Sequence, residues 1–139
     1  MLYILGDTSK TWEAVARILA AREKVDMVAL YYPGTEIPPS PFLVAARFED
    51  LEPVTTWDED ASATASARMH VNSQFLGSLA ALSFDSFEGD LALYPPRTRE
   101  WIACAIPHEK MVLVRDDQLL GPLREVGVPA LDTAPDGWW

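Results

Sequence analysis

The chain opens with Met1-Leu2-Tyr3-Ile4-Leu5-Gly6-Asp7-Thr8-Ser9. A short apolar run that ends at a glycine is typical of a buried strand. Thr8 or Ser9 can then cap a helix, because a hydroxyl oxygen accepts a hydrogen bond from an orphan backbone N–H. Apolar residues follow at helical spacing, namely Trp12, Val15, Ala16 and Leu19. The sequence therefore predicts a first strand followed directly by a helix.

Apolar runs and helical stretches alternate along the rest of the chain. Further strands are predicted at residues 25–32, 91–94, 111–114 and 128–131, and further helices at residues 61–82, 100–106 and 119–126, the last ended by Gly127. Residues 33–41 carry four prolines, which excludes a long helix there, and residues 42–51 suit either a short helix or a strand. Alternation of this kind indicates a three-layer α/β/α fold, in which helices cover both faces of a central, mostly parallel sheet.

Composition limits what such a chain can be. With 139 residues, 49% hydrophobic and 23% charged, we expect one globular domain spanning residues 1–139. No stretch is long and apolar enough to span a bilayer, and no signal peptide is recognisable, so we expect a cytoplasmic protein without a membrane partner. A lone cysteine, Cys104, fits a reducing compartment. The net charge of −10 opposes general attraction to phosphate, so any contact with nucleic acid needs local cations, a metal ion or a basic partner.

Several acids follow the predicted strands. Asp7 follows the first strand, Glu36 the second, and Asp116 and Asp117 follow residues 111–114, while Glu100 opens the helix predicted before that strand. The carboxyl ends of parallel strands meet at one edge of a sheet, so we expect these carboxylates to converge. Carboxylate oxygens suit a hard cation such as Mg²⁺ or Mn²⁺, which activates a bound water. The pattern predicts metal-assisted hydrolysis of a phosphodiester.

The same residues resemble a known family. The string Asp7-Thr8-Ser9 after a short strand is similar to the opening of PIN-domain nucleases. The later motifs of that family resemble residues 100–106, His108, residues 113–117 and the final Gly127-Val128-Pro129-Ala130-Leu131. Arg115 stands where the family usually has a threonine or serine. Acid spacing and chain length are similar to those of the VapC-like toxins of toxin–antitoxin pairs.

That resemblance implies a metal-dependent ribonuclease. The implied catalytic and metal-binding acids are Asp7, Glu36, Glu100 and Asp117, with Asp116 assisting at the metal. Thr8 and Ser9 would support the site, and Arg97 and Arg99 would orient the RNA backbone. We would then expect Mg²⁺ or Mn²⁺ as cofactor, RNA as substrate, a homodimer, and a small antitoxin protein as partner.

Other interpretations stay open on the sequence alone. The chain could be a catalytically degenerate PIN-like domain, or a nucleotide-processing α/β enzyme that uses the same loops. Its acidity also suits an inhibitor or immunity-type protein that covers a basic partner. Arg97-Thr98-Arg99 could steer a phosphate or pair with nearby carboxylates. The terminal Trp138 and Trp139 could anchor a partner, fold back onto the core, or form a loose tail.

Overall fold

The computed structural model describes residues 1–31, 57, 64–65, 68–79, 84 and 89–138. In these residues the strands are β1 (Leu2–Leu5), β2 (Asp26–Tyr31), β3 (Thr64–Ala65), β4 (Met69–His70), β5 (Gly89–Tyr94), β6 (Ala103–Ile106), β7 (Met111–Val114) and β8 (Ala130–Leu131). The α-helices are α1 (Thr8–Arg22), α3 (Ser73–Leu79) and α4 (Leu120–Glu125), and short 3-10 turns η2 (Pro107–Glu109) and η3 (Asp117–Leu119) flank β7.

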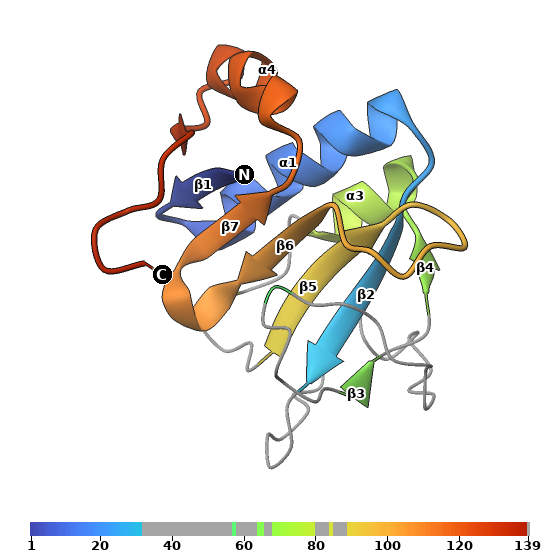
Figure 1. Cartoon of the computed structure of the whole chain (residues 1–139). Helices are drawn as coiled ribbons and strands as arrows, with labels where there is room; N and C mark the ends of the chain where they lie inside the picture. Colours follow the sequence, from blue (N-terminus) through green and yellow to red (C-terminus); the bar gives the residue numbers. More distant parts are fainter. Residues whose placement is uncertain (32–56, 58–63, 66–67, 80–83, 85–88, 139) are drawn as a thin grey trace.

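The eight described strands form one antiparallel sheet (Figure 1). Its order is β3-β2-β5-β6-β7-β1-β8, with β4 also paired to β2. Every described pair of neighbours is antiparallel. The prediction of a mostly parallel sheet is therefore wrong.

Short connections explain the antiparallel order. Only Pro107 to Lys110 separate β6 from β7, whereas a parallel connection needs a crossover of about a dozen residues or more. The turn closes with Lys110 in the left-handed region at φ 51°, where its N–H donates to the carbonyl of Pro107. β7 then runs back beside β6 and pairs with β1 on its other edge, with Leu2 opposite Val114 and Leu5 opposite Met111.

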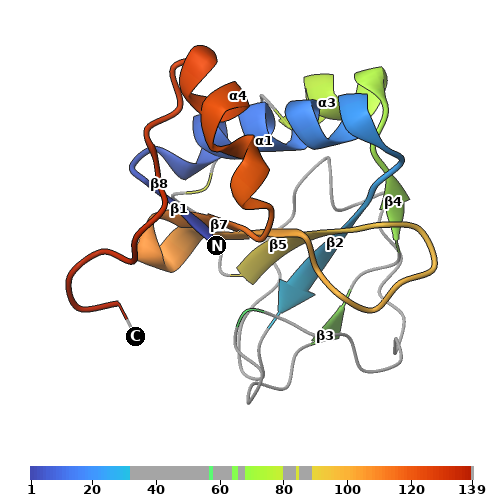
Figure 2. The ribbon, with the colours of Figure 1, turned by 45° about the horizontal axis from the view of Figure 1, so that its top comes forward.

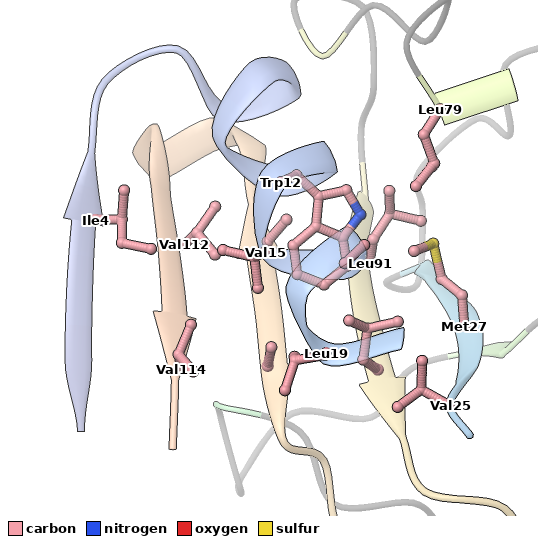
Figure 3. Close-up of a cluster of buried hydrophobic side chains, with 14 of the residues drawn as sticks. Ile4, Trp12, Val15, Leu19, Val25, Met27, Leu79, Leu91, Val112 and Val114 are labelled. Carbon is pink, nitrogen blue, oxygen red and sulfur yellow. The ribbon is translucent and has the colours of Figure 1, made fainter. Parts of the chain in front are cut away.

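All three described α-helices lie on the same face of the sheet (Figure 2). This arrangement contradicts the predicted three layers, in which helices cover both faces. Helix α1 connects β1 to β2, and three strands stand between these two in the sheet, so the helix crosses over β6 and β7. Its buried side chains, Trp12, Val15 and Leu19, point onto the strands (Figure 3). They meet inward residues such as Ile4, Leu91 and Val112 in a common core.

Alternate residues of the same strands build a second core on the face away from the helices. This second core contains Val28, Leu30, Ala92, Tyr94, Trp101, Cys104, Ile106, Met111 and Leu113. Side chains along a strand point alternately to opposite faces, so a central strand needs apolar residues at every position to be buried on both sides. All residues of β5, β6 and β7 are indeed buried.

Two predicted helices are wrong. Within residues 61–82, the described parts are the strands β3 and β4 and the seven-residue helix α3. Residues 100–106 contain the buried strand β6, which pairs on both edges. The strands predicted at residues 2–5, 25–32, 91–94, 111–114 and 128–131, and the helices predicted after Asp7 and at residues 119–126, are confirmed apart from their bounds. The predictions for residues 33–41 and 42–51 lie outside the described residues.

No helix in the described part of the chain is long and apolar enough to cross a bilayer.

Trp12 offers a test of the packing between α1 and the sheet. Its side chain is fully buried, and its indole N–H has no hydrogen-bond partner. We expect Trp12→Ala to lower the free energy of unfolding by about 3–5 kcal/mol through the cavity it leaves. Trp12→Phe should cost less than about 2 kcal/mol, because it retains a ring and removes an unsatisfied donor. Urea denaturation measures both values, and equal losses would contradict this packing.

Candidate functional site

β1 and β7 are antiparallel, so the predicted site residues that follow these two strands lie at opposite ends of the strands. We call the end where β1 stops the Asp7 end, and the end where β7 stops the Asp117 end. Gly6 N–H donates to the Lys110 carbonyl at 3.2 Å, so the Asp7 end also contains the turn between β6 and β7. The amino group of Met1 contacts the carboxylate of Asp117, so the start of β1 lies at the other end.

Asp7 is an exposed residue at the N-cap of α1. Its carboxylate accepts a hydrogen bond from Ser9 Oγ at 2.9 Å, and its carbonyl accepts one from Thr11 Oγ1 at 2.9 Å. Thr8 is buried as the first residue of the helix. Asp7, Thr8 and Ser9 therefore organise the beginning of α1, and Glu100, Asp116 and Asp117 lie at the far end of the sheet.

The acids of the Asp117 end are paired with cations. Asp117 contacts the N-terminal amino group, and Asp116 lies 3.8 Å from Arg22 of α1. Asp116 also accepts a hydrogen bond from the Gln118 N–H at 2.9 Å, which caps η3. These contacts compensate both carboxylates locally.

Glu100 is also compensated, by the arginine that departs from the family pattern. Its carboxylate lies 3.8 Å from Arg115, and the Arg115 guanidinium stacks over the Trp101 ring at 5.0 Å. The backbone N–H of Arg115 donates a hydrogen bond to the Ile102 carbonyl, and this bond holds residues 100–102 beside the end of β7. Of the predicted metal ligands, the structure thus brings Glu100, Asp116 and Asp117 to one end and leaves Asp7 at the other, while Glu36 lies outside the described residues.

The described residues contain no group of three or more His, Cys, Asp or Glu side chains able to hold a metal ion. The expected convergence of Asp7, Glu100 and Asp117 is wrong, because the carboxyl ends of antiparallel neighbours lie at opposite ends of the strands.

Arg97 and Arg99 lie in the loop between β5 and β6, at the Asp117 end, and both are exposed. Arg97 has φ 64°, in the left-handed region that non-glycine residues rarely adopt. The guanidinium of Arg68 donates hydrogen bonds to the carbonyls of Pro95 and Thr98 in the same loop. Arg68 also lies 3.7 Å from Asp26 and 5.2 Å from the centre of the Tyr94 ring. Arg68 therefore anchors this loop to the sheet.

A different cluster lies at the Asp7 end, on the face away from the helices. Its members are Trp57, Asp90, His108 and Trp138. The Asp90 side chain is fully buried, and one of its oxygens accepts a hydrogen bond from Trp57 Nε1 at 2.7 Å. Its other oxygen lies 3.9 Å from Nδ1 of the half-exposed His108. The Trp57 ring is 5.8 Å from that of Trp138 and 6.5 Å from that of His108.

A buried carboxylate carries a large desolvation cost unless donors or cations compensate it. In this cluster an indole N–H from residue 57 supplies one such donor, and a protonated His108 would add a positive charge. Trp138 packs against the second core as well, so the structure selects folding back among the alternatives for this residue. Trp139 lies outside the described residues. The cluster therefore ties three distant parts of the chain to β5.

Cys104 lies near this cluster but is not a nucleophile. Burial, followed by the negative charge of Asp90, raises the pKa of the Cys104 thiol well above its ordinary value. The neutral thiol is a poor nucleophile, so Cys104 packs as a small apolar residue. Burial, followed by the nearby Cys104, also raises the pKa of the Tyr94 hydroxyl, and Arg68 opposes this shift.

Sequence reasoning missed Asp90 and Trp57. An aspartate beside the apolar run Leu91-Ala92-Leu93 reads as the solvated start of a strand. Its burial depends on a side chain 33 residues away, and no local pattern signals that contact. The apolar run Leu91-Ala92-Leu93 was a signal that this strand is buried, because a strand that is apolar at every position is covered on both faces.

Comparisons with protein-family models, with curated proteins and with solved structures found no match to this chain. The resemblance to PIN-domain nucleases therefore stays a prediction.

The hydrogen bond between Trp57 and Asp90 can be tested by a double-mutant cycle. Trp57→Phe should lower the free energy of unfolding by about 1–3 kcal/mol, because it removes a donor from a buried carboxylate. After Asp90→Ala, the same substitution should cost at least about 0.5 kcal/mol less. Additive losses in urea denaturation would show that the two side chains do not interact.

The raised pKa values predict a loss of stability in alkali. Above the ordinary thiol pKa the unfolded chain releases the Cys104 proton, whereas the native state retains it. Unfolding then becomes more favourable as pH rises, by up to about 1.4 kcal/mol per pH unit for one proton. We expect this decline to begin above the ordinary thiol pKa of about 8.5, and Cys104→Ala should make it shallower. An unchanged slope in Cys104→Ala would contradict the assignment.

Proposed function

We propose that this protein is an acidic binding protein, of the inhibitor or immunity type, that covers a basic protein partner. The observation that carries this proposal is the uneven distribution of charge between the described strands and helices and the segment that connects β2 to β3.

Charge is nearly balanced in the residues that the structure describes, which include twelve Asp and Glu against ten Lys and Arg. Residues 32–63 carry seven acids and a single basic residue, Arg47. Concentrated charge of one sign raises the rate at which an oppositely charged partner arrives and fixes its orientation. A basic protein is the complement of such a segment.

This acidic segment leaves and rejoins the sheet at adjacent positions. It follows Tyr31, the last residue of β2, and it ends before Thr64, the residue paired with Tyr31 in β3. Between these two points Trp57 bonds to the buried Asp90. Tyr31, Trp57 and Thr64 are therefore three described positions that lie on the sheet.

A metal-dependent ribonuclease draws less support from the geometry. It requires Asp7 near Glu100 and Asp117, and these residues lie at opposite ends of the sheet. The cations that would orient RNA, Arg97 and Arg99, also lie away from Asp7, at the Asp117 end. The acidic binding protein needs none of these residues to meet.

The salt dependence of association tests the proposal. Egg-white lysozyme serves as a basic protein probe, and its association rate with the wild type should fall steeply as salt is added. The variant Glu49→Gln/Asp50→Asn/Glu52→Gln should associate about tenfold more slowly at low salt, because it removes three charges from the acidic segment. Stopped-flow fluorescence measures both rates.

A charge-matched variant is the control for this experiment. Glu23→Gln/Glu100→Gln/Glu125→Gln removes three exposed charges that lie outside the acidic segment, and it should slow association less than twofold. Equal slowing by the two variants would contradict a localised binding segment. Cleavage of RNA that depends on Mn²⁺ and is abolished by Asp7→Asn would overturn the proposal in favour of the nuclease.

A further inference from the structure

Residues 132–138 follow β8 and pass to the face of the sheet away from the helices (Figure 2). Five of these seven residues are exposed, and the other two, Pro135 and Trp138, are half-buried. The segment turns before Trp138, where Gly137 has φ 83° and the Trp138 N–H donates to the Pro135 carbonyl at 3.0 Å. The Trp138 ring then packs against the second core beside Trp57. A segment with few buried side chains opens at a lower free-energy cost than an element of the core.

Trp138 covers the same ring that compensates the buried carboxylate of Asp90. The centroids of the Trp138 and Trp57 rings lie 5.8 Å apart, which is within the range of an attractive aromatic pair. Trp57 Nε1 donates to the fully buried Asp90 carboxylate at 2.7 Å. Such a hydrogen bond is strongest where water is excluded, because water competes for both partners. Loss of the Trp138 ring therefore exposes more of Trp57 to water and weakens its bond to Asp90.

Trp57 is also part of the acidic segment. It lies within residues 32–63, and Asp58-Glu59-Asp60 follow it directly in the sequence. The hydrogen bond from Trp57 to Asp90 of β5 therefore attaches the segment to the sheet at the position just before these three acids. A contact that controls Trp57 controls this attachment.

We propose that residues 132–138 form a strap that regulates the acidic segment. When the strap is closed, Trp138 covers Trp57 and preserves its hydrogen bond to Asp90. When the strap opens, Trp57 leaves Asp90 and the acidic segment loses this attachment to β5, so the basic partner dissociates faster. This inference rests on the proposed function and adds a regulatory contact to the same segment.

The two cores allow a strap to be distinguished from a residue that only adds to overall stability. Trp12 is fully buried in the core beneath α1, on the opposite face of the sheet, so its indole N–H exchanges with water when that core opens. The indole N–H of Trp57 exchanges when its bond to Asp90 opens. A strap changes the exchange rate of Trp57 alone, whereas a loss of overall stability raises both rates.

Solvent exchange of the indole N–H groups, measured by NMR, tests the strap. Trp138→Ala should speed exchange at Trp57 about tenfold, because it removes an aromatic contact and admits water. Exchange at Trp12 should change less than about twofold, which also shows that the variant is folded. Trp138→Phe retains a ring and should keep most of the protection of Trp57. Val126→Ala, which alters an exposed apolar residue at the end of α4, should leave both rates unchanged.

A second measurement connects the strap to binding. Trp138→Ala leaves the charge of the protein unchanged, and it should raise the rate at which lysozyme dissociates about threefold, since interface changes act mainly on dissociation. Trp138→Phe should dissociate at nearly the rate of the wild type. Stopped-flow fluorescence measures both rates.

The outcomes separate this inference from the proposed function. Equal acceleration of exchange at Trp57 and Trp12, or no acceleration at Trp57, overturns the strap. Faster exchange at Trp57 with unchanged dissociation of lysozyme overturns the regulatory role and leaves the basic partner in place. Absence of salt-dependent association between lysozyme and the wild type overturns the proposed function and the regulatory role with it, whereas the exchange rates still decide whether Trp138 closes over Trp57.

Discussion

The antiparallel pairing of β1 with β7 is the constraint on which the rest of the structure depends. The four-residue turn between β6 and β7 makes those two strands antiparallel, and β1 pairs antiparallel with β7 on its other edge. Once β7 runs opposite to β1, the residues that follow the two strands are separated by the length of the sheet. Asp7 then begins a helix at one end, and Asp117 meets the N-terminal amino group at the other.

The same constraint produces two different ends of one sheet. At the Asp117 end, side chains are mutually compensated, with Arg22, Arg68 and Arg115 each beside a carboxylate. At the Asp7 end, the buried carboxylate of Asp90 accepts a hydrogen bond from Trp57 and lies 3.9 Å from His108. The proposed binding role rests on a separate feature, the seven acids and single arginine of residues 32–63.

Local structure was largely predictable from the sequence, but strand direction was not. The sequence predicted both β1 and α1. The apolar residues Trp12, Val15 and Leu19 recur at the spacing of one helix face, which distinguishes a helix from a strand. The run Ala103-Cys104-Ala105-Ile106 is too short to distinguish a buried helix from a buried strand. Reading it as a helix placed a crossover before β7, made the sheet parallel, and so brought Asp7 and Asp117 together. One ambiguous segment thus changed the predicted fold and the predicted metal site. Asp90 and Trp57 could not be paired from sequence, because their contact is set by the face to which each points.

Nuclear Overhauser effects between β1 and β7 test the antiparallel pairing most directly. In an antiparallel ladder, the residues of alternate opposed pairs approach to about 4.5 Å between their Cα atoms, which gives strong contacts between the two α-protons. We predict such contacts at alternate positions among the pairs Leu2–Val114, Tyr3–Leu113, Ile4–Val112 and Leu5–Met111. Their absence, with the slanted amide-to-α-proton contacts of a parallel ladder in their place, would contradict the separation of Asp7 from Asp117.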